Sequence, residues 1–314
     1  MQAILTNVIA FFVMMIIGFG ANRIGVLPNE SNKYLVDLLM KITCPCMILS
    51  TTTSQALSED TFVNAGIMLL GSILFFALFY FISWVFCVKI MKIKPEEGAG
   101  VYMMIFTTVN NGFIGFPITK AIFGDEMMFW MVFFQIILML YLYSAGIIQT
   151  DYGYKPAADR KAFFKKVINP STVCAAAGLI LLALGVHLPE MFKKAIDSVG
   201  NATTPISMIV IGIQLGSSNF NKVIKNKKLV ITSIVKMISC PLITLLIVHW
   251  LPIPSALKIT LVFGATFPAA VAVVPIASME GKDAVLGAEG VAFTTLLSIA
   301  TMPMVAYLLT MLYL

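Results

Sequence analysis

Apolar stretches long enough to cross a lipid bilayer follow one another along almost the whole chain. We place ten of them at about 3–22, 33–54, 62–88, 98–122, 127–148, 170–188, 198–217, 229–250, 255–279 and 288–312. A helix needs about 20 apolar residues to span the hydrocarbon core, where backbone polar groups must be bonded within the protein. Only 11% of the residues are charged, against about 25% in soluble domains. The pattern predicts an all-α integral membrane protein with ten transmembrane helices.

Lysines and arginines alternate strongly between the connections that join these stretches. Fifteen lie in the odd-numbered connections, of which the longest is at 149–169, and three lie in the even-numbered ones. Connections rich in these residues stay in the cytoplasm. We therefore predict a multi-pass protein of the plasma (cell) membrane, with a cytoplasmic central loop and both termini outside. The net charge of +6 then reflects topology, and we do not expect nucleic acid as a partner.

Matching patterns at an offset near 160 residues divide the chain into two similar halves. IGVLP at 24–28 matches LGVHLP at 184–189, and TCP at 43–45 matches TTP at 203–205. GFPI at 115–118 likewise matches VVPI at 273–276. Because each repeat holds five helices, an odd number, the second repeat must enter the membrane inverted, as in many secondary transporters. We predict a first inverted repeat at 1–148, the cytoplasmic loop at 149–169 and a second repeat at 170–314.

The fourth stretch carries residues that oppose a continuous helix near the bilayer centre. Asn110 and Asn111 precede Gly112, Gly115 and Pro117. Proline has no N–H to donate, and glycine leaves helical angles at little steric cost. We predict that this helix is broken and that Pro117 lies in the first turn of its second half, a position that suits proline.

The ninth stretch has a corresponding interruption at Thr266, Pro268 and Pro275. Its prolines deprive the carbonyls of Gly264 and Val271 of their usual helical partners. Unpaired groups at this depth are tolerated where they are buried in protein or line a wet cavity. If the two breaks cross, the N-termini of the second half-helices offer N–H groups and partial positive charge that favour a carboxylate. The alternative is a pair of ordinary proline kinks.

Three lysines lie inside the predicted spans, where an ionisable side chain is a functional candidate by default. Lys236 either attracts an anion on the cytoplasmic side or extends back to the interface. Lys41 follows Asp37 by four residues, so we expect a local ion pair. Lys120 either holds a carboxylate or reaches the outer headgroups, and we favour the headgroups.

These motifs resemble those of the auxin efflux carrier family, which includes plant auxin exporters and bacterial permeases for malate- or malonate-like acids. Residues 110–117 match the crossover of that family, Gln135 matches a glutamine beside the substrate, and Pro268 and Pro275 match its paired prolines. The resemblance implies a scaffold of helices 1, 2, 6 and 7 and a mobile transport domain of helices 3–5 and 8–10. It also implies a homodimer and elevator-like movement.

Some residues depart from the plant pattern. Ile136 follows Gln135, where the plant carriers tend to have a polar residue, and helix 3 carries no charged residue between Thr61 and Cys87, where they place a carboxylate. The central hydrophilic loop is also much shorter. A small carboxylate is therefore a better expectation than auxin, and the resemblance points to a bacterial malate/malonate-permease-like member.

The sequence thus predicts a secondary transporter that moves a small organic anion (a carboxylate such as malate, malonate or an auxin-like acid) by elevator-type alternating access. We expect neither a metal nor a cofactor. One alternative is a sodium-coupled symporter of the bile-acid-transporter type. The other is an intramembrane enzyme, but His187 and His249 lie at span ends, and the HExxH and GxSxG motifs are missing. The substrate contacts that we expect come from Asn110, Asn111, Gly115, Pro117, Gln135, Thr266, Pro268, Pro275 and Lys236.

Overall fold

A computed structural model describes residues 2–55, 58, 60–154, 169–186, 188–218 and 220–314, and every regular element in that part of the chain is helical. Among these described residues, seven helices are long and apolar enough to cross a membrane by length and composition. Three shorter apolar helices accompany them at Ile9–Arg23, Pro170–Ala183 and Ser255–Ala265. Each of these ten segments overlaps a different one of the ten predicted spans. An all-α membrane protein is therefore confirmed, and the number of crossings stays a prediction.

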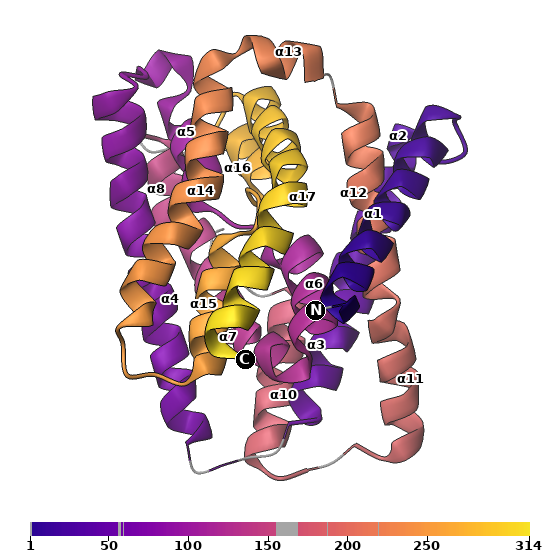
Figure 1. Cartoon of the computed structure of the whole chain (residues 1–314). Coiled ribbons are helices and arrows are strands. Elements are labelled where there is room, and N and C mark those ends of the chain that lie inside the picture. Colours follow the sequence, from indigo (N-terminus) through magenta and orange to yellow (C-terminus); the bar gives the residue numbers. More distant parts are fainter. Residues whose placement is uncertain (1, 56–57, 59, 155–168, 187, 219) are drawn as a thin grey trace.

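The helices run side by side, with α13 at one end of the molecule and the start of α4 at the other (Figure 1). In the first half they are α1 Gln2–Arg23, α2 Asn29–Leu38, the π-helix η1 Leu39–Thr43, α3 Cys44–Thr53, α4 Thr61–Trp84, η2 Val85–Ile90, η3 Pro95–Glu97, α5 Ala99–Thr107, η4 Asn111–Gly115, α6 Phe116–Phe123, α7 Asp125–Leu142 and α8 Ala145–Thr150. In the second half they are α10 Pro170–Ala183, α11 Glu190–Asn201, α12 Thr203–Ser217, α13 Phe220–Lys225, α14 Lys227–His249, α15 Ser255–Ala265, α16 Val273–Met279 and α17 Ala284–Tyr313.

Two differences from the predicted spans lie beside glycine and proline. The helix α10 ends five residues before its predicted end, because Gly185 adopts a left-handed φ of 64°, which terminates helices. The helix α11 begins eight residues before its predicted start, directly after Pro189, whose backbone is extended. Lys193 and Lys194 lower the hydropathy of α11, which is why the apolar pattern missed its first turns.

Two pairs of helices pack with their backbones in close contact, α1 with α12 and α10 with α3. A Cβ atom added at Gly18 of α1 would lie 2.3 Å from the carbonyl oxygen of Ile209 in α12. One added at Gly178 of α10 would lie 2.9 Å from the Cβ of Thr52 in α3. Small residues allow this approach between membrane helices. Glycine is therefore required at both contacts.

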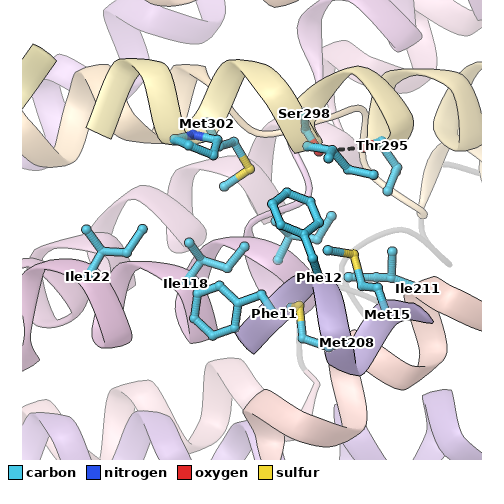
Figure 2. Close-up of a pocket in the computed structure, with 13 residues that line it drawn as sticks. Phe11, Phe12, Met15, Ile118, Ile122, Met208, Ile211, Thr295, Ser298 and Met302 are labelled. Carbon is cyan, nitrogen blue, oxygen red and sulfur yellow. Dashed lines mark hydrogen bonds between the residues drawn. The ribbon is translucent and has the colours of Figure 1, made fainter. Parts of the chain in front are cut away.

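An apolar seam separates α1 and α12 from α6 and α17. Figure 2 shows Met208 of α12 and Met302 of α17 on opposite sides of it. The hydroxyl of Ser298 bonds to the carbonyl of Thr295 over 2.7 Å, so it stays within its own helix. The cavity in the seam measures about 30 Å³, enough for about one water. Its lining residues are Phe11, Phe12, Met15, Ile114, Ile118, Ile122, Met208, Ile211, Thr295, Ser298, Ile299, Met302 and Pro303.

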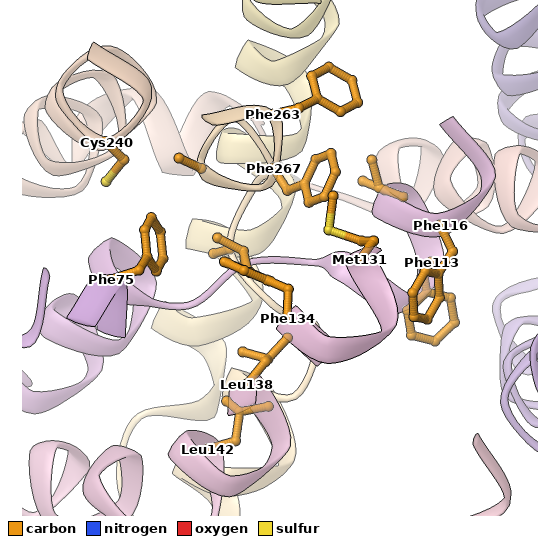
Figure 3. Close-up of a cluster of buried hydrophobic side chains, with 14 of the residues drawn as sticks. Phe75, Phe113, Phe116, Met131, Phe134, Leu138, Leu142, Cys240, Phe263 and Phe267 are labelled. Atoms are coloured by element: carbon orange, nitrogen blue, oxygen red, sulfur yellow. The ribbon is translucent and has the colours of Figure 1, made fainter. Parts of the chain in front are cut away.

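The hydrophobic core is centred on α7, which buries fourteen of its eighteen residues. The ring of Phe134 lies 5.3 Å, centroid to centroid, from the rings of both Phe75 and Phe76 in α4. On another side, Phe134 contacts α15 beside Gly264. Figure 3 shows this side chain between Phe75 and the segment that carries Phe267. A helix that is apolar all round belongs inside a bundle, so α7 supports the interrupted helices from within.

Candidate functional site

Two helices are interrupted in the middle of the bundle. Residues 108–110 separate α5 from the π-turn η4 that leads into α6, and residues 266–272 separate α15 from α16. The two gaps touch, because the backbone N–H of Asn110 donates to the carbonyl of Pro268 over 2.7 Å. Both helices are therefore broken, and their breaks meet, as the prolines, glycines and asparagines predict.

Two threonine hydroxyls hold the longer break in place. The N–H of Ala270 donates to Oγ1 of Thr108 over 3.2 Å, and the N–H of Ala269 donates to Oγ1 of Thr294 over 3.1 Å. All four residues are buried, and buried N–H groups need partners. Thr294 is not among the substrate residues that the sequence predicts, because its sole signal is a polar residue inside an apolar stretch, where such residues usually hydrogen-bond within or between helices.

Asn110 connects the gap to the helix that follows it. Its backbone is non-helical, with φ −87° and ψ 70°, and its Oδ1 accepts the N–H of Phe113 over 3.3 Å. Its carbonyl accepts the N–H of Gly115 over 3.0 Å. This is N-terminal capping by asparagine. Asn110 therefore starts the second half-helix and also bonds to the opposite break.

Asn111 and Gly115 form the contact with the opposite break. Asn111 is fully buried, and its Nδ2 donates to the carbonyl of Met131 in α7 over 3.3 Å. Its Oδ1 has no hydrogen-bond partner. A Cβ added at Gly115 would lie 2.3 Å from that oxygen and 2.5 Å from the ring of Phe267. Glycine here lets the ring from one broken helix lie against the other.

The prolines occupy the positions predicted for them. Pro117 is the second residue of α6 and Pro275 the third of α16, so both lie in first turns. The carbonyls of Gly264 and Val271 do lack their usual helical partners, but tighter three-residue turns satisfy them. The N–H of Phe267 reaches Gly264 at 3.4 Å, and that of Val274 reaches Val271 at 3.2 Å.

Thr266 closes the end of α15. Its Oγ1 donates to the carbonyl of Phe263 over 2.6 Å, and its side chain is fully buried. A threonine hydroxyl that returns to its own helix leaves the backbone free to change direction. In this conformation the Thr266 hydroxyl thus stabilises the end of α15 at the break.

Lys236 does not extend to the interface. Its side chain is fully buried, and Nζ donates to the carbonyls of Thr108 over 2.6 Å and Phe106 over 3.3 Å. Phe106 lies in the last turn of α5 and Thr108 directly follows that helix, where the helix dipole is negative. The lysine therefore lies at the crossing, against the C-terminal end of the first half-helix.

The other two lysines within the predicted spans form ion pairs. Lys41 pairs with Asp37 at 3.0 Å, as its spacing predicts. Lys120 pairs with Asp125 at 3.0 Å, across the turn between α6 and α7. The expected reach of Lys120 toward headgroups stays a prediction, and its pairing with the carboxylate at the start of the next helix was not expected from the sequence.

Gln135 lies on α7, one turn beyond the Met131 carbonyl that Asn111 contacts. It is 6% exposed, and its Oε1 is buried without a hydrogen-bond partner. Residues four apart lie on the same face of a helix, so Gln135 and the Asn111 contact share one face of α7. A buried carboxamide without a partner is costly, and a bound polar molecule would supply one.

A polar network that the sequence reasoning missed supports α5. The Nε2 of Gln149 in α8 donates to Oγ of Ser83 over 2.8 Å and to Oγ1 of Thr107 over 3.2 Å, and its Oε1 accepts the hydroxyl of Tyr141. Gln149 and its three partners come from four different helices. Such satisfied networks rigidify a core, so α5 is held firmly up to its last residue.

Comparison with known proteins identifies relatives along nearly the full length. A family model described as "Membrane transport protein" matches residues 3–158 and 154–306. The chain is 21% identical to the uncharacterized transporter MJ1031 of Methanocaldococcus jannaschii, over 96% of this chain and 97% of that protein. It is also 21% identical to the uncharacterized transporter YfdV of Escherichia coli K12, over 96% of both chains. The family and these relatives are transporters, which fits the prediction of a non-enzyme.

Proposed function

The chain belongs to the membrane transport protein family, the auxin efflux carriers that its motifs resemble, and on this premise we propose that it is a secondary transporter for a small organic anion. The observation that carries the proposal is the bond between the two breaks, from the Asn110 N–H to the Pro268 carbonyl. Irregular backbone at membrane depth is typical of substrate sites in transporters. The substrate that we propose is a carboxylate such as malate, malonate or an auxin-like acid.

The chemistry at the crossing suits a carboxylate. The second half-helices begin there, and helix N-termini direct N–H groups and partial positive charge at an anion. Gln135 adds a carboxamide whose oxygen has no partner, and rotation of that group by a half turn would present its NH₂ donors instead. We assign the substrate contacts to the crossing and to Gln135, with Lys236 beside them against the end of α5. The residues assigned at the crossing are Asn110, Asn111, Gly115, Pro117, Thr266, Pro268 and Pro275.

Contacts related by one offset support two inverted repeats of five helices each. Gly18 packs on Ile209, and Gly178 packs on Leu49, with 3.4 Å from an added Cβ to the leucine Cδ1. Adding 160 to the residue numbers of Gly18 and Leu49 gives Gly178 and Ile209. The glycine of each half therefore contacts, in the other half, the residue that corresponds to its counterpart's partner. We propose repeats at 1–148 and 170–314, related in this way.

The packing also supports movement of one group of helices against another. We propose that α1–α3 and α10–α12 form a scaffold and that α4–α8 and α14–α17 carry the crossing past it, as in an elevator. The seam between α1 and α12 on one side and α6 and α17 on the other is almost entirely apolar. An apolar seam has few directional bonds to break when helices slide. The family resemblance extends this proposal to a homodimer in the plasma membrane.

Transport by purified protein in proteoliposomes tests the proposal. Radiolabelled malonate, malate and indole-3-acetate would be offered under an imposed membrane potential. We expect uptake of at least one acid above empty liposomes, and a loss of about tenfold or more in Asn110→Ala and Gln135→Ala. Asn64→Ala, an amide near the start of α4 and outside the crossing, serves as the control and should retain uptake. Unchanged uptake in both site variants would remove this site, and no uptake of any acid would remove the substrate class.

A further inference from the structure

Lys236 is a buried cation whose observed partners are backbone carbonyls. Its Nζ donates to Thr108 at 2.6 Å and to Phe106 at 3.3 Å. The thiol of Cys240, one turn further along α14, points to the same Phe106 carbonyl at 3.9 Å. None of the ion pairs found among the described residues includes Lys236. Carbonyl oxygens at the end of α5 therefore balance its charge.

The end of α5 has the properties of a cation site. A helix C-terminus carries partial negative charge, and unwound carbonyls at such breaks coordinate the coupling Na⁺ in other transporters. Here an ammonium group that is covalently attached to α14 occupies two of those oxygens. It cannot dissociate into solution on either side of the membrane.

The matching end of α15 has internal partners instead. The hydroxyl of Thr266 and the N–H of Phe267 bond to the carbonyls of Phe263 and Gly264. In the described part of the chain, no group of three or more His, Cys, Asp or Glu residues could hold a metal ion. Of the two helix ends at the crossing, the end of α5 is thus the one whose carbonyls contact a cation, and Lys236 supplies that cation.

We propose that Lys236 is a tethered cation that takes the place of an exchangeable coupling ion, so that transport needs no sodium. This inference rests on the proposed carrier function and decides against the sodium-coupled alternative. Lys236 is a positioning residue in this account. It neutralises the end of α5 and leaves the positive half-helix N-termini as the charge that a substrate anion meets.

Thermal unfolding of the purified protein tests the cation without any substrate. Lys236→Ala removes three methylenes and the ammonium, which together equal propylammonium. We expect a midpoint several degrees lower, and recovery of most of that loss when propylammonium chloride is added. Lys227→Ala, an exposed lysine at the start of the same helix, should show neither effect. A purely space-filling role would give recovery with the neutral analogue propanol as well, and that result would overturn the proposal.

A second pair of variants covers the case in which Lys236→Ala does not fold. Lys236→Arg retains the charge, and Lys236→Met retains length without charge. We expect the arginine variant to unfold at the higher temperature. The opposite order would overturn the proposal.

Malonate uptake by the wild-type protein provides a test that needs no variant. Rates in sodium chloride and in N-methyl-D-glucamine chloride should agree, and Lys236→Ala should lose about tenfold or more and regain uptake with propylammonium. A wild-type protein that stops transporting without sodium would overturn the inference. Failure of wild-type uptake for every acid would instead remove the carrier function, while the thermal test would still judge Lys236.

Discussion

Gly115 is the residue at which the two breaks leave the least room. An added Cβ would lie 2.3 Å from Oδ1 of Asn111 and 2.5 Å from the ring of Phe267. We expect Gly115→Ala to lower the free energy of unfolding by about 1–3 kcal/mol, the usual cost of overpacking. Thermal unfolding checks this against Gly20→Ala, where nothing lies within 4 Å. Equal midpoints for the two variants would mean that the ring and the amide move aside without cost.

Individual residues differ in how far their roles could be predicted. Asn110, Gly115 and Pro117 carry conformational preferences that hold in any surroundings, so the sequence placed the break correctly. The Lys41–Asp37 pair was predicted because its partners lie four residues apart. The partners of Lys236 are carbonyl oxygens of another helix, and since every residue has a carbonyl, no sequence pattern marks them.

At the scale of the element, α17 supports the break of its neighbour through one hydroxyl. Oγ1 of Thr294 accepts the N–H of Ala269 and donates to the carbonyl of Gly290 over 2.7 Å. Thr294→Val keeps the shape but leaves a buried N–H unpaired, so we expect a loss of about 1–3 kcal/mol in unfolding free energy. Thr310→Val removes a hydroxyl that bonds within the same helix and serves as the matched control. Thermal unfolding that lowered both midpoints equally would contradict this role of Thr294.

The ends of helices were predictable where an apolar stretch ends abruptly. They were not predictable where an amphipathic turn extends a helix beyond its apolar stretch. The span of α4 and η2, at Thr61–Ile90, agrees with the predicted 62–88 because charges follow it directly. The first turns of α11 carry lysines and escaped the apolar pattern. The π-helical turns η1 and η4 also had no signal, since they depend on packing around them rather than on composition.

At the scale of the whole molecule, the alternation of charge agrees with where the chain turns. Three lysines from odd-numbered connections pair with carboxylates of their neighbours, Lys222 with Glu289, Lys228 with Glu97, and Lys282 with Asp151. The pairing of Glu97 with Lys228 lowers the pKa of that carboxyl group. The helix α13 and the starts of α14 and α17, which carry or adjoin these lysines, lie at one end of the molecule (Figure 1), so a single labelling experiment can determine the orientation.

Lys225 and Trp250 lie at opposite ends of α14 and are both exposed, Trp250 at 82%. In a variant that lacks the five native cysteines, each would be replaced by cysteine and treated in intact cells with a membrane-impermeant maleimide. Lysine-rich connections stay in the cytoplasm. We therefore expect Trp250→Cys to be labelled in intact cells and Lys225→Cys to be labelled only after the cells are permeabilised. The reverse pattern would invert the orientation and place the buried Lys236 nearer the outer face. Labelling of both positions in intact cells would mean that α14 does not cross the membrane, which would remove the basis for an inverted repeat.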